Sequence, residues 1–107
     1  MPTSNSNGSQ TATVTTEHTL ATITTSGNFI IGIDCNAMAL GDITTFRVKL
    51  KVRSVGTTRT VFTATYSHVQ EDLVKLSIPV ASTNEIVFTL EQETGTGRAY
   101  PWEIWEL

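Results

Sequence analysis

The chain is short of cysteine, of charge and of long apolar runs, and each shortage excludes something. Cys35 is the only cysteine in 107 residues, so neither an intrachain disulfide nor a cysteine-based zinc site can form. Only 16% of the residues are charged and the net charge is −3, whereas nucleic-acid and anionic-membrane binders are normally basic. The apolar runs are too short for a bilayer, and the N-terminus lacks the pattern of a secretion signal. We therefore expect synthesis in a cytoplasm, with neither nucleic acid nor a membrane as partner.

Threonine, by contrast, makes up about one residue in five. Its β-branched side chain suits a pleated strand, and no window shows a helical apolar repeat of useful length. Strand-like segments separated by turns predict strands at 11–16, 18–25, 29–34, 43–53, 59–66, 73–80, 85–93 and 98–107. In the segment 73–80, Leu76 and Ile78 are expected to face the core. Because short connections favour antiparallel pairing, the sequence predicts an all-β antiparallel β-sandwich, of which a jelly roll is one form.

The first residues, Pro2-Thr-Ser-Asn-Ser-Asn-Gly-Ser-Gln10, carry neither charge nor a large apolar side chain. Such a segment cannot form a core of its own. We expect residues 1–12 to be a flexible polar arm, and residues 13–107 to be a single sandwich domain. A polar terminus is ordered only where something holds it, so an ordered arm would indicate a neighbouring chain or lattice packing.

The strongest pattern is the strict alternation from Phe46 to Arg53. A period of two places the apolar residues on one face of a strand and the basic residues on the other. The basic face holds four of the seven Lys and Arg residues: Arg47, Lys49, Lys51 and Arg53. Two interpretations stay open, a docking surface for an acidic partner or ordinary cross-strand pairing with acids such as Glu91 and Glu93.

Aromatic residues gather near the C-terminus, in Tyr100-Pro-Trp-Glu-Ile-Trp105. Alternation puts Tyr100, Trp102 and Ile104 on one face and Trp105 on the other. We expect Trp102 in the core, whereas Trp105 fits a core position or a subunit interface. Since large aromatics are typical interface anchors, Tyr100 and Trp105 join the four basic residues as candidate interface residues.

No arrangement of residues indicates catalysis. His18 and His68 have no motif around them, and Cys35 is interpreted as a small buried hydrophobe rather than a reactive thiol. A calcium site is an alternative that uses three oxygen-bearing residues: Asp34, Asn36 and Asp42. Their surroundings lack the ligand and the glycine that an EF-hand loop requires. We expect no enzyme, no catalytic residue, no cofactor and no metal.

Three segments resemble small β-rich proteins of tailed bacteriophages: Leu20-Ala-Thr-Ile-Thr-Thr-Ser-Gly-Asn-Phe29, Phe46-Arg-Val-Lys-Leu-Lys-Val52 and Gly95-Thr-Gly-Arg-Ala-Tyr-Pro-Trp-Glu-Ile104. The likeness runs from about Thr19 to Leu107, and the closing segment is its most specific part. Capsid decoration (cement) proteins are the best-fitting class. The resemblance implies a non-enzymatic virion protein on the capsid surface, a homotrimer that binds the major capsid protein and bridges its subunits.

A second hypothesis comes from a different class of protein. A β-sandwich of this size also suits a carbohydrate- or receptor-binding module of a phage tail or fibre, in which Trp105 or Tyr100 would stack on sugar rings. Binding to glycans and location at the tail would favour this module over a cement protein.

Overall fold

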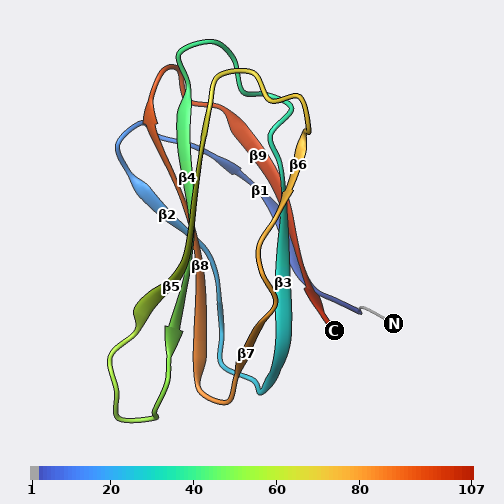
Figure 1. The fold of residues 1–107 in the computed structure, drawn as a ribbon, viewed down its shortest axis with the longest axis vertical. Helices are drawn as coiled ribbons and strands as arrows, with labels where there is room; N and C mark the ends of the chain where they lie inside the picture. The colour runs from blue at the N-terminus through green and yellow to red at the C-terminus, as the bar shows by residue number, and fades with distance from the viewer. Residues whose placement is uncertain (1–2) are drawn as a thin grey trace.

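The computed structural model describes residues 3–107, which form nine strands and no helix (Figure 1). The strands are β1 (Thr3–Thr11), β2 (Glu17–Ile23), β3 (Gly27–Asp34), β4 (Ile43–Lys51), β5 (Arg59–Ser67), β6 (Val74–Leu76), β7 (Val80–Ser82), β8 (Glu85–Thr94) and β9 (Ala99–Glu106). The molecule measures 40 × 31 × 18 Å along its principal axes. It is therefore an elongated, flat body with two well separated ends.

The strands lie in two antiparallel sheets. One sheet has the order β1-β9-β3-β6, with the short β7 pairing the other half of β3, and the second has the order β2-β8-β4-β5. When β6 and β7 are taken as one interrupted strand, this is the order of a jelly roll, which is built from two Greek keys. The predicted antiparallel β-sandwich is confirmed, and its topology is the jelly-roll form.

Alternation explains which side chains fill the space between the sheets. The first sheet contributes inward side chains from β3 and β9: Phe29, Ile31, Ile33, Tyr100 and Ile104. The second sheet contributes inward side chains from β4 and β8: Phe46, Val48, Ile86, Phe88 and Leu90. Burying an aliphatic or phenyl side chain of this size stabilises the fold by about 1.5–3 kcal/mol. This shared core is what holds the two sheets together.

Residues 3–11 form an edge strand, so the expected flexible arm is wrong for the part of it that the structure describes. β1 pairs with β9 from Thr3, opposite Glu106, to Thr11, opposite Ala99. Ladder hydrogen bonds to β9 pair one side of its backbone within the chain, so no neighbouring chain is needed to order it. None of its side chains is fully buried, which is why its composition matches that of a free arm. The strand expected at 11–16 is a turn beyond Thr11, and residues 1–2 of the expected arm lie outside the described residues.

We expect deletion of residues 1–11 to leave a folded chain that is about 1–3 kcal/mol less stable and more prone to self-association. The lost ladder bonds are partly offset by the entropy of a segment that no longer needs ordering. Deletion also makes β9 a free edge and uncovers Trp102, which lies close over Gly8. Thermal unfolding and sedimentation velocity would measure both effects. An unfolded product, or a monomer of unchanged midpoint, would contradict this expectation.

Two of the expected strands differ in the structure, and the first of them, 43–53, is shorter. β4 ends at Lys51, because β8 begins opposite it at Glu85 and offers no partner further on. Val52, expected on the core face, is instead 78% exposed.

The expected strand 73–80 is split into β6 and β7, and its inward residues are the reverse of those expected. Ile31 N–H donates to Ser77 Oγ (3.1 Å), and Ser77 N–H donates to Ile31 O (3.0 Å). These bonds hold Ser77 inward and turn its neighbours Leu76 and Ile78 to the outside, where both are exposed. Side-chain hydrogen bonding has overridden the hydrophobic pattern here.

Candidate functional site

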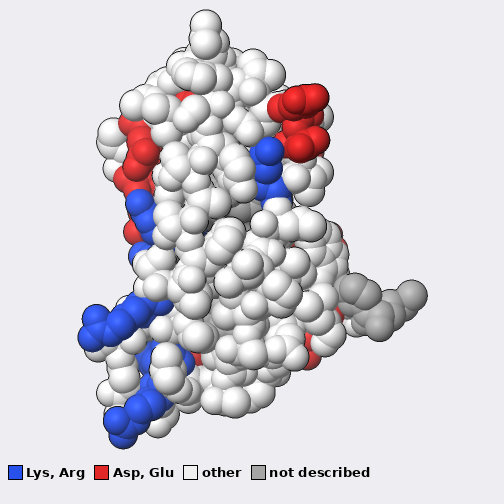
Figure 2. All heavy atoms as spheres, viewed as in Figure 1, with Lys and Arg blue, Asp and Glu red and all other residues white. Residues whose placement is uncertain are grey.

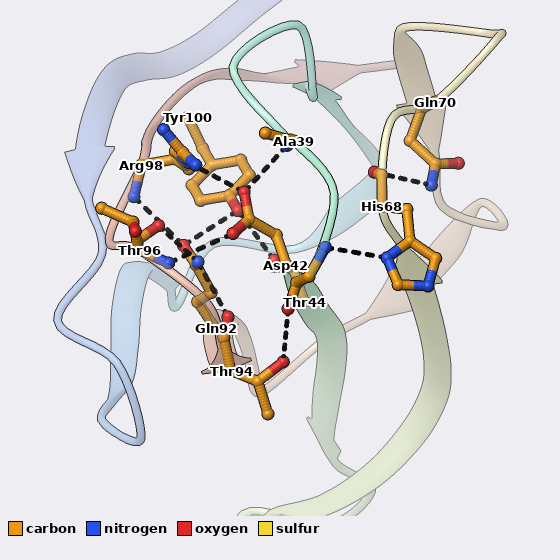
Figure 3. Close-up of polar contacts among 11 residues, drawn as sticks. Ala39, Asp42, Thr44, His68, Gln70, Gln92, Thr94, Thr96, Arg98 and Tyr100 are labelled. Carbon is orange, nitrogen blue, oxygen red and sulfur yellow. Dashed lines mark hydrogen bonds and ion pairs between the residues drawn. The ribbon is translucent and has the colours of Figure 1, made fainter.

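A polar cluster at one end of the sandwich is centred on Asp42, just before β4 (Figure 3). The Asp42 side chain is only 1% exposed. It accepts hydrogen bonds from Ala39 N–H (2.9 Å) and Thr96 N–H (3.2 Å), and it forms an ion pair with Arg98 Nε (2.8 Å). Asp42 therefore ties the β3–β4 loop to the turn between β8 and β9.

The β8–β9 turn can approach Asp42 because residue 95 is a glycine. Gly95 has a φ of +91°, in the region that side chains disfavour, and a Cβ there would collide with the Asp42 carboxylate. Beside it, Thr94 Oγ1 donates to Gly41 O (2.8 Å). The two loops are thus joined at three positions of the turn, by the side chains of Thr94 and Arg98 and by the backbone N–H of Thr96.

The charge of Asp42 is stabilised by these donors. Burial alone would raise the pKa of Asp42, but the hydrogen bonds from Ala39, Arg98 and Thr96 outweigh burial and hold the pKa below its ordinary value of 3.8. Its oxygens are therefore engaged by this chain, which removes Asp42 from the calcium alternative. Among residues 3–107, no three His, Cys, Asp or Glu side chains gather in a group that could hold a metal ion.

Tyr100, one of the candidate interface residues, lies in the core with 0% exposure, so that prediction is wrong. Its hydroxyl lies 2.7 Å from Thr44 Oγ1 and donates to Gln92 Oε1 at 3.1 Å. Gln92 is itself buried, and its Oε1 also accepts from Arg98 N–H (3.1 Å). Burial raises the pKa of Tyr100 above its ordinary value. Tyr100 thus extends the Asp42 cluster into the space between the sheets.

The remaining reactive residue types have structural roles. Cys35 is fully buried, as expected, and burial raises the pKa of its thiol to about 12, so it stays protonated at neutral pH. His18 Nε2 accepts from Thr13 N–H (2.9 Å), and His68 Nδ1 accepts from Gly41 N–H (2.9 Å). Each histidine holds a turn in place.

Half of the basic stripe is paired with acids across the sheet. Arg47 contacts Glu91 at 2.9 Å and Glu17 at 3.1 Å, and Lys49 contacts Glu17 at 3.1 Å. Burial alone would raise the pKa of Glu17, but bonds from Thr89, Lys49 and Arg47 outweigh it and lower the pKa. For Arg47 and Lys49, the cross-strand alternative therefore describes the structure, with Glu17 in place of the expected Glu93.

The other half of the stripe belongs to the β4–β5 hairpin. Lys51 is half-buried at the end of β4, and Arg53 is exposed in the loop that follows. Arg59, which the stripe did not include, is exposed where β5 begins. Figure 2 shows basic side chains gathered at this lower end of the molecule, over the β4–β5 hairpin. We call Lys51, Arg53 and Arg59 with the loop between them the cationic tip.

Trp105 lies on the outer face of the sheet formed by β9, β3 and β6, and Trp102 packs against the core, as expected. The Trp105 ring crosses Gly32 so closely that a Cβ there would be 2.7 Å from it. Leu76 reaches the same glycine from β6, and Leu76 and Val74 are 56% and 58% exposed. We call Trp105, Leu76 and Val74 the Trp105 surface.

A shallow hollow of about 250 Å³ lies beside Trp105. Val74 and Pro101 give it apolar walls, and Asp34 and Glu103 place carboxylates at its edge. An aromatic ring beside carboxylate acceptors suits a ligand with both apolar faces and hydroxyl groups.

The structure thus divides the six candidate interface residues among four places. Arg47 and Lys49 are ion-paired, Tyr100 is in the core, Lys51 and Arg53 join the cationic tip, and Trp105 anchors an apolar surface. Sequence reasoning missed Leu76 and Val74, because it placed the strand 73–80 with the opposite face inward. It also missed Arg59. The available signal was that this basic residue begins the strand predicted at 59–66.

Comparison of the chain with protein-family models, with curated proteins and with solved structures finds no match. Within residues 3–107 there is also no apolar helix of membrane-spanning length.

Proposed function

We propose that this chain is a non-enzymatic structural protein of a bacteriophage virion. In this proposal it is a capsid decoration protein, made in the host cytoplasm, that binds the major capsid protein on the outside of the head. It assembles as a homotrimer and stabilises the head by bridging neighbouring capsid subunits. Two things support the proposal, the resemblance of three sequence segments to phage proteins of this class and the Trp105 surface.

The Trp105 surface is the structural observation that carries the proposal. Tryptophan is among the commonest residues at the energetic centre of protein interfaces, where neighbouring apolar side chains keep water out. Here the Trp105 ring on β9 packs closely over Gly32 of the paired strand β3, with exposed Leu76 and Val74 beside it. A rigid anchor loses little conformational entropy on binding. Such a surface suits contact with a large, regular protein lattice.

The buried polar groups are consistent with a structural role. Tyr100 donates to Gln92, and both Gln92 and Asp42 accept hydrogen bonds from backbone N–H groups of the β8–β9 turn. These groups brace loops rather than converging on an open cleft. Many shallow contacts repeated over a lattice bind strongly in sum even when each is weak.

We expect Trp105→Ala combined with Leu76→Ser to weaken attachment to phage heads by at least about tenfold, since interface anchors contribute about 2 kcal/mol or more. The matched control is Val61→Ser, which also removes an exposed apolar side chain but lies on β5 of the other sheet. Binding would be measured by co-sedimentation with heads that lack the chain. Equal binding of the double variant would exclude the Trp105 surface as the contact.

The wider proposal is tested on particles with and without the chain. We expect density for it on the shell, and loss of DNA at a lower temperature when it is absent. Equal heat stability together with an undecorated shell would exclude the decoration role.

The hollow beside Trp105 favours one second candidate, a carbohydrate- or receptor-binding module of a tail or fibre. Asp34 and Glu103 would accept hydrogen bonds from sugar hydroxyls while Trp105 contacts the ring. A glycan array distinguishes the two candidates. Binding abolished by Glu103→Gln, with the chain located at the tail, would replace the decoration role by this one.

A further inference from the structure

The cations of this chain are distributed unevenly. Three of the seven Lys and Arg residues form ion pairs within the chain: Arg47, Lys49 and Arg98. A fourth, Lys75, lies 4.8 Å from the centre of the Tyr66 ring. The three that remain, among the residues that the structure describes, are the three of the cationic tip: Lys51, Arg53 and Arg59.

The cationic tip is apolar as well as basic, and it is held in shape. Val52 and Val55, between its basic residues, are 78% and 81% exposed. The loop is fixed by Asn84 Nδ2, which donates to Val52 O (2.9 Å), and by Gly56 N–H, which donates to Arg53 O (2.9 Å). Glu85, the acid opposite Lys51 in register, accepts a bond from Thr58 Oγ1 (2.8 Å). The tip therefore presents positive charge around an uncovered apolar centre.

The other end of the long axis carries the complementary surface. The loop between β5 and β6 holds Glu71 and Asp72, both exposed, between Val69 and Leu73, which are 69% and 41% exposed. We call these four residues the acidic loop. Figure 2 shows acidic side chains at this upper end, with a small basic patch directly below them, and the larger group of basic side chains at the lower end. Figure 1 shows that β5 runs the length of the molecule from the cationic tip to this loop, which is why the two lie at opposite ends.

The acidic loop is also anchored at both ends. His68 N–H donates to Asp42 O (2.7 Å), and Cys35 N–H donates to Leu73 O (2.7 Å). Two short anchored elements of opposite charge, each with exposed aliphatic side chains next to its charged ones, are suited to pack together.

From this complementarity we infer that copies of the chain associate head to tail, with the cationic tip of one copy on the acidic loop of the next. The two elements lie at opposite ends of one rigid sandwich, so they cannot meet within a copy. Tip against tip or loop against loop would oppose like charges. The contact is therefore heterologous, and it closes into a ring or continues as a filament according to the angle between copies. This inference does not depend on the virion role.

The contact is small, one hairpin loop on another, so we expect a weak, concentration-dependent association. Exposed charge pairs are screened over about 10 Å at 0.1 M salt. Association should therefore be clear at about 0.05 M salt and lost at about 0.5 M, where the Debye length is only a few ångströms.

A charge-exchange experiment on the full chain tests the pairing. One variant reverses the tip, Arg53→Glu with Arg59→Glu, and the other reverses the loop, Glu71→Lys with Asp72→Lys. Each alone has two ends of like sign and should be monomeric by sedimentation velocity, with its association weakened by at least about tenfold. Mixed in equal amounts, the two variants should associate again, because each tip now meets a loop of opposite charge.

A matched control reverses Glu93 and Glu106 to lysine, which changes the net charge as much as the loop reversal but acts on β8 and β9. It should associate like the natural chain. All reversed residues of the tip and loop are exposed, so circular dichroism should show unchanged folding. A monomeric natural chain at high concentration and low salt would overturn the inference. So would single variants that associate normally, or a mixture that stays monomeric.

Discussion

Replacing Asp42 by alanine is expected to lower the free energy of unfolding by about 3 kcal/mol. The substitution leaves two backbone donors, Ala39 N–H and Thr96 N–H, without their acceptor, and it removes the partner of Arg98. Part of the loss is recovered because Arg98 is 30% exposed and can turn towards water. Urea unfolding followed by tryptophan fluorescence would measure the change.

The matched control is Asp34→Ala. Asp34 is half-exposed, and its carboxylate accepts one bond, from Asn36 N–H (2.9 Å). We expect this control to cost less than about 1 kcal/mol. Equal effects at the two positions would mean that Asp42 does not tie the loops together.

The same cluster makes the free energy of unfolding depend on pH in the acidic range. The folded pKa of Asp42 lies below its ordinary value of 3.8, so its contribution is complete well above pH 4. As the pH falls below about 4, the unfolded chain takes up the proton first, and the contribution is lost progressively. Asp42→Asn should flatten this part of the curve of unfolding free energy against pH. Glu17, whose pKa is also lowered, should leave a residual slope.

Tyr100→Ala should be at least as damaging, at about 4 kcal/mol, because it empties a fully buried aromatic position. Tyr100→Phe keeps the ring but leaves Thr44 Oγ1 without the hydroxyl, so we expect a loss of about 1–2 kcal/mol. Tyr66→Phe is the control, since no hydrogen bond of the Tyr66 hydroxyl links it to this cluster. If Tyr100→Ala left stability unchanged and weakened assembly instead, Tyr100 would be an interface residue after all.

The parts of the fold that were predictable are those where hydrophobic alternation and burial agree. The β4, β8 and β9 strands each place apolar side chains at every second position against a shared core. The period-two pattern in the sequence was therefore enough to predict these strands. β1 has no such signal, because its pairing with β9 uses backbone groups that every residue carries. The face of β6 was mispredicted because the Ser77–Ile31 bonds, which join strands far apart in the chain, decide it.

The candidate contact residues were harder to predict than the fold. Alternation identified the basic stripe but not the Glu17 that neutralises half of it, because the pairing of β2 with β8 sets that neighbour. The pairing of Asp42 with Arg98 spans 56 residues. Trp105 was placed correctly on the face opposite Trp102, but the choice between core and interface stayed open, and its support by Gly32 required the register of β3 against β9.

The position of β9 in its sheet has a consequence for synthesis on the ribosome. β9 lies between β1 and β3, yet it follows every other strand in chain order. Until it emerges, the first and third strands have an unfilled gap between them, and β1 has no partner to pair with. The nascent chain should therefore stay sensitive to proteases until β9 has left the exit tunnel, and then fold in one late step. Pairings this distant in sequence also slow that step, so the interval is when the chain most needs protection from aggregation.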